Sequence, residues 1–92
     1  MDTSNAAMAK DNAVVITKDN KKYLVTQTPF EVYRRSLSAM LDRYLADELG
    51  YVLATDGMVH LTGLGHPGPH FVEIVLELSE IKDILPLTPA AA

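Results

Sequence analysis

Cysteine and tryptophan are absent from this chain of 92 residues. Without cysteine the chain can form neither a disulfide framework nor a thiolate metal site, which fits a reducing compartment. The chain also has no apolar run near the ~18 residues needed to span a bilayer, and residues 1–12 lack the apolar core of a signal peptide. We therefore expect a soluble, cytoplasmic protein with no membrane partner.

Basic side chains are scarce in the second half of the chain. Residues 1–50 carry seven basic and seven acidic side chains, whereas residues 51–92 carry one basic and five acidic ones. Nucleic acids and anionic membranes are bound through basic surfaces. This distribution argues against nucleic acid as a partner.

The length of the chain corresponds to one domain, and no internal repeat divides it. We expect a flexible N-terminal tail at residues 1–12, a single domain at 13–85 and a flexible C-terminal tail at 86–92. A domain of this size buries only about 60–65% of the surface of its unfolded chain. Its stability therefore depends on covering most of its apolar side chains.

One long helix is expected at residues 28–50. Thr28 can cap the helix, Pro29 suits its first position, Glu31 completes a capping box, and Gly50 can end it. At about 100° per residue, seven apolar side chains share one stripe: Phe30, Tyr33, Leu37, Met40, Leu41, Tyr44 and Leu45. We expect this stripe to pack against a sheet.

Two further features of this helix concern partners. Val32, Ala39 and Ala46 recur at seven-residue intervals on the opposite face, where small side chains would let another helix approach. Alanine is also the best helix former, which is the simpler interpretation. Arg34 and Glu48 project into the apolar arc, one near each end, and either extend to water or anchor a ligand or partner.

Strands are expected on both sides of the helix. Residues 13–17 and 22–27 form a hairpin, and a two-residue turn at Asp19-Asn20 would place Val14 opposite Val25 and Val15 opposite Leu24. After the helix, Asp56-Gly57 is the strongest hairpin signal in the chain. It predicts a second hairpin between residues 51–55 and 58–62.

The chain ends with a strand at residues 70–78 and a short helical turn at 79–85 that stops at Pro86. These elements predict an α+β domain with a mostly antiparallel sheet of four to five strands packed on one long helix, in ββαβββ order. The order is similar to that of a β-grasp-like roll. That likeness concerns the fold and implies no function.

Three histidines lie within eleven residues: His60, His66 and His70. Three imidazoles suit Zn²⁺ or another divalent metal, and Asp56 or Glu73 could add a carboxylate. The alternative is that these histidines are unrelated surface and half-buried residues. No nucleophile elbow, phosphate-binding loop or dinucleotide fingerprint is present, so no catalytic residue is assigned. A metal-dependent enzyme is thus the second hypothesis, with a divalent metal its one candidate cofactor.

The first hypothesis follows from a count of sheet faces. One helix covers one side of a sheet, and the expected registers fill that side with Val14, Ile16, Tyr23, Val25, Val52, Ala54, Val59, Leu61, Val72, Ile74 and Leu76. The opposite side would carry Val15, Leu24, Tyr51, Leu53, Met58, Phe71 and Val75.

Burying a large apolar side chain is worth about 1.5–3 kcal/mol, and contiguous exposed apolar patches mark contact sites. We therefore expect a protein–protein interaction module, such as an adaptor, inhibitor or regulator. It would act as a homodimer through this sheet face, or through the helix at Val32, Ala39 and Ala46. The rival explanation is that Ile81, Ile84, Leu85 and Leu87 fold back over the sheet.

Overall fold

A computed structural model describes residues 12–64 and 71–87 of the chain. Two strands come first, β1 (Ala13–Thr17) and β2 (Lys22–Val25), followed by the helix α2 (Pro29–Asp47). Three strands follow: β3 (Val59–Leu64), β4 (Phe71–Leu76) and β5 (Ile81–Pro86), with a 3₁₀ turn, η1 (Leu78–Glu80), before β5. The α+β class, with one antiparallel five-stranded sheet and one helix, is confirmed. No helix in the described part of the chain has the length and apolarity needed to cross a membrane.

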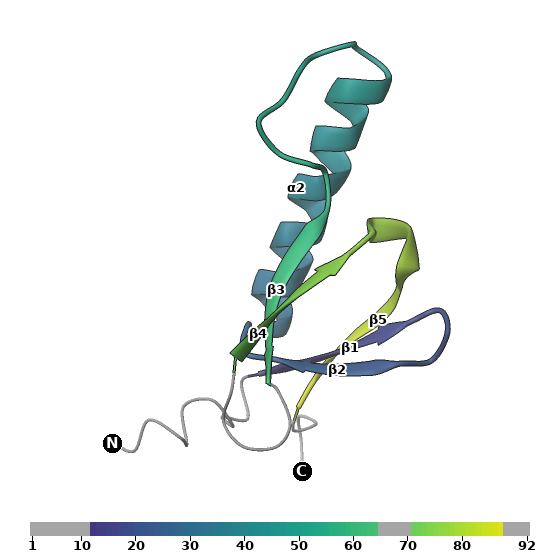
Figure 1. Ribbon diagram of the computed structural model, residues 1–92. Helices are drawn as coiled ribbons and strands as arrows, with labels where there is room; N and C mark the ends of the chain where they lie inside the picture. Colours follow the sequence, from purple (N-terminus) through teal and green to yellow (C-terminus); the bar gives the residue numbers. More distant parts are fainter. Residues whose placement is uncertain (1–11, 65–70, 88–92) are drawn as a thin grey trace.

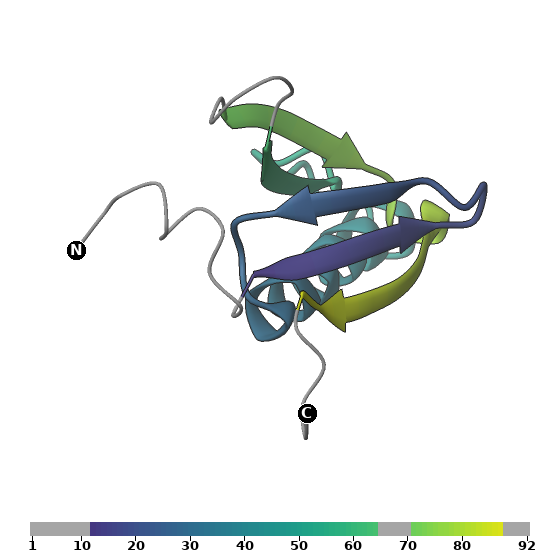
Figure 2. The ribbon, with the colours of Figure 1, turned by 90° about the horizontal axis from the view of Figure 1, so that it is seen from below.

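The five strands form one sheet in the order β4-β3-β2-β1-β5 (Figure 1). All four pairings are antiparallel, including that of β1 with β5. A β-grasp-like roll pairs its first and last strands in parallel, so this finer expectation is wrong. Figure 2, which shows the molecule from below, places α2 behind β1 and β5.

The first hairpin forms, but its register is shifted by one residue from the expected one. Val15 pairs with Tyr23, and Ala13 pairs with Val25. The loop is Lys18-Asp19-Asn20, with Asn20 in the left-handed region at φ 66°, rather than a two-residue turn. Because strand side chains alternate, a one-residue shift moves a whole apolar set to the other face. Val15 is therefore fully buried in the core and not on the outer face.

The second expected hairpin is wrong. The turn itself is present, because Gly57 has φ 69° and the Met58 N–H donates to Asp56 Oδ1 at 2.9 Å. Residues 51–55, however, form no strand. They return along the helix, where the Tyr51 N–H donates to Leu45 O at 3.0 Å. β3 pairs instead with β4 and, at one position, with β2.

The helical turn expected at residues 79–85 is present as the 3₁₀ turn η1 up to Glu80, but residues 81–86 form a strand instead. β5 pairs with β1, placing Ile84 opposite Val15 on the core side. Ile81 and Ile84 pack against the core and are half-buried, whereas Leu85 remains 40% exposed. The pairing reaches past Pro86, since the Leu87 N–H donates to Asn12 O at 2.8 Å. These residues thus extend the sheet at its edge, and the rival explanation, that they fold back over the sheet, is wrong.

The ends of the helix follow the sequence signals. Thr28 Oγ1 accepts the Glu31 N–H at 3.1 Å, as an N-cap does. The Glu31 carboxylate binds Arg34 instead of closing a capping box. At the other end, Gly50 takes φ 76°, the left-handed conformation that ends many helices.

The face of the helix that meets the sheet is the reverse of the expected one. The buried helix residues are Val32, Ser36 and Ala39. They complete a core formed by Ala13, Val15, Val25, Val59, Leu61 and Leu76. These short side chains let the helix lie close to strands that already carry branched and bulky residues. The large apolar stripe consequently points away from the sheet.

Candidate functional site

The outward side of α2 carries a row of exposed, large apolar side chains, which we call the apolar helix face. It comprises six side chains that are between 44% and 76% exposed: Phe30, Tyr33, Leu37, Met40, Leu41 and Tyr44. Five of them follow the alternating spacing of three and four residues that is typical of helix–helix seams. A surface helix normally turns such a stripe inward, so this one lacks the cover that its composition requires.

The exposed apolar residues continue beyond the helix. Leu49, Tyr51 and Val52 are 53%, 60% and 99% exposed. Figure 1 shows that the C-terminal half of α2 and the segment after it project past β1, β2 and β5. We call this projection, residues 41–58, the arm. The described strands β1, β2 and β5 leave it uncovered.

Contacts within the arm join the end of α2 to the segment that follows it. Thr55 Oγ1 donates to Asp42 Oδ2 at 2.5 Å, and Arg43 donates to Met58 Sδ at 3.6 Å. Arg43 also forms an ion pair with Glu77 at 3.2 Å, which ties the helix to the segment after β4. The arm is therefore a defined structure with an apolar outer side.

The residues predicted to form an interface are distributed differently from the expectation. Tyr51, Phe71 and Val75 are exposed, and Leu24, Leu53 and Met58 are half-buried. Val15, Val32 and Ala39 are buried in the chain's own core and present no surface. Ala46 is exposed beside a small hollow that it lines with Leu53.

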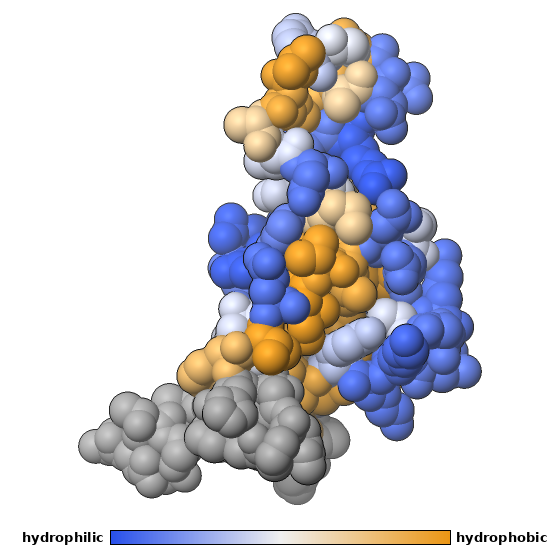
Figure 3. Space-filling view, in the orientation of Figure 1, coloured by the Kyte–Doolittle hydropathy of each residue, from blue (hydrophilic) through white to orange (hydrophobic). Residues whose placement is uncertain are grey.

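The sheet also carries apolar surface. Phe71, Val72, Val75 and Leu85 are between 40% and 59% exposed. Figure 3 shows an apolar area between β4 and β5, with hydrophilic side chains on either side of it. Because β4 and β5 are the two edges of the sheet, the exposed apolar residues of these strands form separate, smaller areas.

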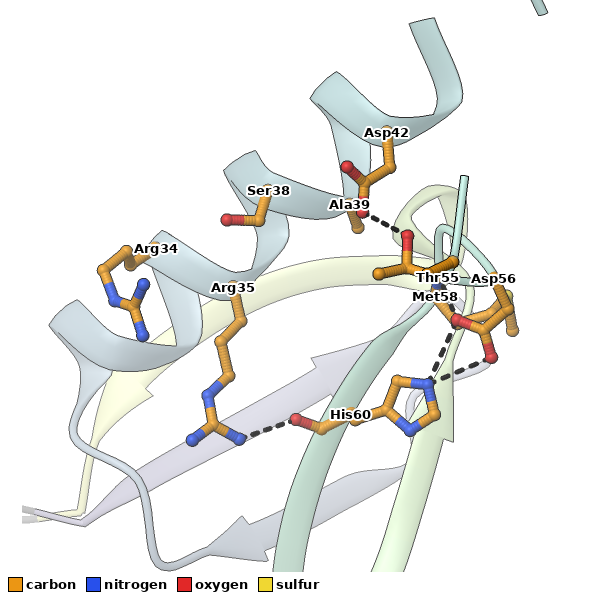
Figure 4. A pocket seen from close by; sticks show the side chains of 10 residues that line it. Arg34, Arg35, Ser38, Ala39, Asp42, Thr55, Asp56, Met58 and His60 are labelled. Atoms are coloured by element: carbon orange, nitrogen blue, oxygen red, sulfur yellow. Dashed lines mark hydrogen bonds and ion pairs between the residues drawn. The ribbon is translucent and has the colours of Figure 1, made fainter. Parts of the chain in front are cut away.

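A polar groove of about 540 Å³ lies between α2 and the start of β3 (Figure 4). Arg35 crosses it from the helix and donates to His60 O at 2.8 Å. His60 points toward Asp56, whose carboxylate oxygens lie 3.0 and 3.1 Å from Nε2. On the other side of the ring, Nδ1 lies 3.4 Å from Glu73 Oε2.

These carboxylates change the proton affinity of the histidine. The hydrogen bond that His60 donates to the Asp56 carboxylate, and then the one to Glu73, raise the pKa of His60 above its ordinary value. The Met58 N–H, then His60, lowers the pKa of the Asp56 carboxyl. The arrangement favours an imidazolium held between two carboxylates.

The two carboxylates beside His60 argue against a role of this histidine as a metal ligand. A metal ligand offers a free nitrogen lone pair, whereas both ring nitrogens of His60 face carboxylates. His66 and His70 lie outside the described residues. Within residues 12–64 and 71–87, no group of three or more His, Cys, Asp or Glu side chains is arranged to hold a metal ion.

No protein-family model, curated protein or solved structure matches this chain. Its surface is therefore the basis for assigning a function.

The sequence predicts that the large apolar side chains of the helix pack against the sheet, whereas the structure leaves six of them on the surface. A signal for it exists in the sequence: Val32, Ser36 and Ala39 also follow helical spacing, so the helix has two faces able to pack. The larger face continues into Leu49, Tyr51 and Val52, so a single sheet could not cover all of it.

Proposed function

We propose that this chain is a protein–protein interaction module that acts as a homodimer joined through the apolar helix face. One observation carries the proposal: the helix packs its small side chains on the sheet and leaves six large apolar ones in water. Fully burying an exposed side chain of this size is worth about 1.5–3 kcal/mol, and about half of each of these six is still exposed. A small domain has only about 5–15 kcal/mol of net stability, so this face is costly to maintain without a partner.

The apolar helix face is a better candidate for the dimer interface than the sheet is. Its six residues are contiguous along one seam, whereas the exposed Phe71 and Val75 of β4 are separated by Glu73, whose side chain is 72% exposed. Symmetric homodimers are the commonest protein assemblies, and they use one self-complementary patch. The sheet surface then remains available for a second protein, which fits an adaptor, inhibitor or regulator.

A substitution at the centre of the helix face tests the proposal. Leu37→Asp would place a charge on each side of the symmetric contact and remove two buried leucines. Because Leu37 is already more than half-buried in the single chain, the two leucines together lose about 1–3 kcal/mol, which predicts a dimer dissociation constant weaker by a factor of at least ~10. Sedimentation equilibrium measures this change directly.

Ser38→Asp is the matched control, because the neighbouring Ser38 is exposed and lies outside the apolar helix face. It introduces the same residue into the same turn of helix. We expect the control to dimerise as the unmodified chain does. If Leu37→Asp and Ser38→Asp associate equally well, the helix face is not the interface.

A further inference from the structure

We propose that the free edge of β4 is a docking site for an extended strand of another protein, in which a basic residue stands between two apolar ones at alternate positions. Adding a strand to an open sheet edge is a common mode of peptide recognition, because main-chain hydrogen bonds supply affinity and side chains supply specificity. β4 and β5 form the two edges of the sheet (Figure 2). The site goes beyond the homodimer proposed above, which uses the helix.

The backbone groups of β4 that point to its free side follow from the bonds of β3. The Thr62 N–H donates to Gln27 Oε1 at 3.0 Å, and Thr62 O accepts the Thr26 N–H at 2.8 Å. Thr62 therefore directs both of its backbone groups away from β4. In an antiparallel pair, residues directly opposite either exchange both bonds or both point away from each other. Glu73, which pairs with Thr62, thus points its N–H and C=O to the free side of the sheet.

Every second residue of β4 shares this orientation, so the free edge presents the N–H and C=O groups of Phe71, Glu73 and Val75. No hydrogen bond with a described residue uses any of these groups. β4 contains neither lysine nor proline, which natural proteins place on exposed edges to prevent pairing. This edge is therefore open to a further strand.

The opposite edge, β5, is less suited to such pairing. The Leu87 N–H donates to Asn12 O at 2.8 Å and so points toward β1. By alternation, Ile84 and Pro86 point to the free side of β5. The Ile84 N–H is already bound to Asp83 Oδ1 at 2.9 Å, and Pro86 has no N–H. The two edges thus differ in the donors that they offer, which favours β4.

The side chains beside the free groups define the strand that complements them. Leu76 and Ile74 turn toward the core. Phe71, Glu73 and Val75 alternate with them and are exposed on the other face of the sheet. Cross-strand neighbours on one face stabilise each other when they are both apolar or of opposite charge. An apolar, a basic and an apolar residue at alternate positions of the incoming strand meet both conditions.

The charge at this edge favours another protein over a second copy. Glu73 Oε2 lies 3.4 Å from His60 Nδ1, and 72% of the Glu73 side chain is exposed. Its carboxylate can therefore accept a further cation from an incoming strand. A second β4 would bring another carboxylate and no cation. A pairing centred on Glu73 would also set the two like charges opposite each other, which is destabilising.

A synthetic peptide tests the site on the full-length chain. The probe is the capped peptide Thr-Val-Thr-Lys-Thr-Val-Thr, and the control peptide carries glutamate in place of lysine. Titration calorimetry is expected to give the Lys peptide a dissociation constant below about 1 mM, at least about fivefold tighter than that of the Glu peptide. No binding of the Lys peptide, or equal binding of both peptides, overturns the proposal.

Hydrogen exchange identifies the backbone groups that the peptide engages. In the chain alone, the amides of Val72 and Ile74 should be protected because they face β3. The amides of Phe71, Glu73 and Val75 should exchange freely until the Lys peptide is added, and then at least about tenfold more slowly. Unchanged exchange of these three amides with the peptide bound would place the peptide elsewhere and overturn the proposal.

Exchanging the charge on β4 supplies an independent readout. Glu73→Lys should reverse the preference, so that the Glu peptide binds at least about fivefold more tightly than the Lys peptide. Glu80→Lys is the matched control, because Glu80 is exposed and lies outside β4. This control should keep the preference of the unmodified chain for the Lys peptide. If Glu73→Lys keeps that preference too, Glu73 does not select the strand and the proposal fails.

The outcomes also separate this site from the homodimer. A chain that is monomeric by light scattering but binds the Lys peptide loses the homodimer and keeps the site. Protection of the Phe71, Glu73 and Val75 amides without any peptide would mean that a second copy, or another segment of the chain, already occupies this edge. That result would overturn the proposal.

Discussion

At the scale of single residues, Gly63 is packed closely against Ile74 of the neighbouring strand. A Cβ at this position would overlap Ile74 Cδ1 and would lie 3.5 Å from Leu24 O. Gly63→Ala is therefore expected to destabilise the fold by about 1–3 kcal/mol, measured by urea denaturation. Ile74→Val removes the clashing methyl group, so in the Gly63→Ala background it should recover part of the loss. A Gly63→Ala variant with unchanged stability would contradict this packing.

His60 gives the fold a pH dependence with a definite sign. Because Asp56 and Glu73 raise the pKa of His60 in the folded state, the charged imidazole stabilises the fold fully below about pH 6.5. That contribution is lost as the pH rises through the folded pKa. The free energy of unfolding should therefore fall between about pH 6 and 8 more steeply in the unmodified chain than in His60→Gln. Equal slopes in urea titrations of the two proteins would show that these ion pairs add nothing.

The metal hypothesis is also tested at single residues. If His60, His66 and His70 bind a divalent metal, Zn²⁺ should raise the melting temperature, because a ligand of the native state stabilises it by mass action. His66→Ala should remove the rise. No thermal shift with Zn²⁺, Ni²⁺ or Mn²⁺ would dismiss the metal and enzyme hypotheses together.

At the scale of elements, local signals and the first hairpin were predictable, whereas pairings between segments far apart in the chain were not. Thr28, Pro29 and Gly50 mark the ends of the helix because caps depend on neighbouring residues alone. Asp56-Gly57 likewise gives its turn. Which segment pairs with β3 depends on residues far along the chain, and the choice of β4 over residues 51–55 has no local signal.

The first hairpin shows how a one-residue error in the predicted turn length changes the predicted surface of the sheet. Asn20 adopts the left-handed conformation and lengthens the loop to three residues. That single residue moves Val15 from the expected outer face into the core. The predicted interface on the sheet changes accordingly, although the strands themselves were placed correctly.

At the scale of the whole molecule, both faces of the helix are able to pack, and one sheet can cover only one of them. The sequence indicated an excess of apolar surface but assigned it to the sheet. The structure places most of it on the helix and the arm. The difference arises because small side chains at Ser36 and Ala39 let the helix approach the strands more closely than large ones would.

The homodimer is the central claim, and light scattering of the unmodified chain tests it most directly. At micromolar concentration we expect a mass of twice the 10.1 kDa of one chain. A mass of 10.1 kDa that persists up to about 100 µM would contradict it, because a dimer that dissociates there gains only about 5–6 kcal/mol on association.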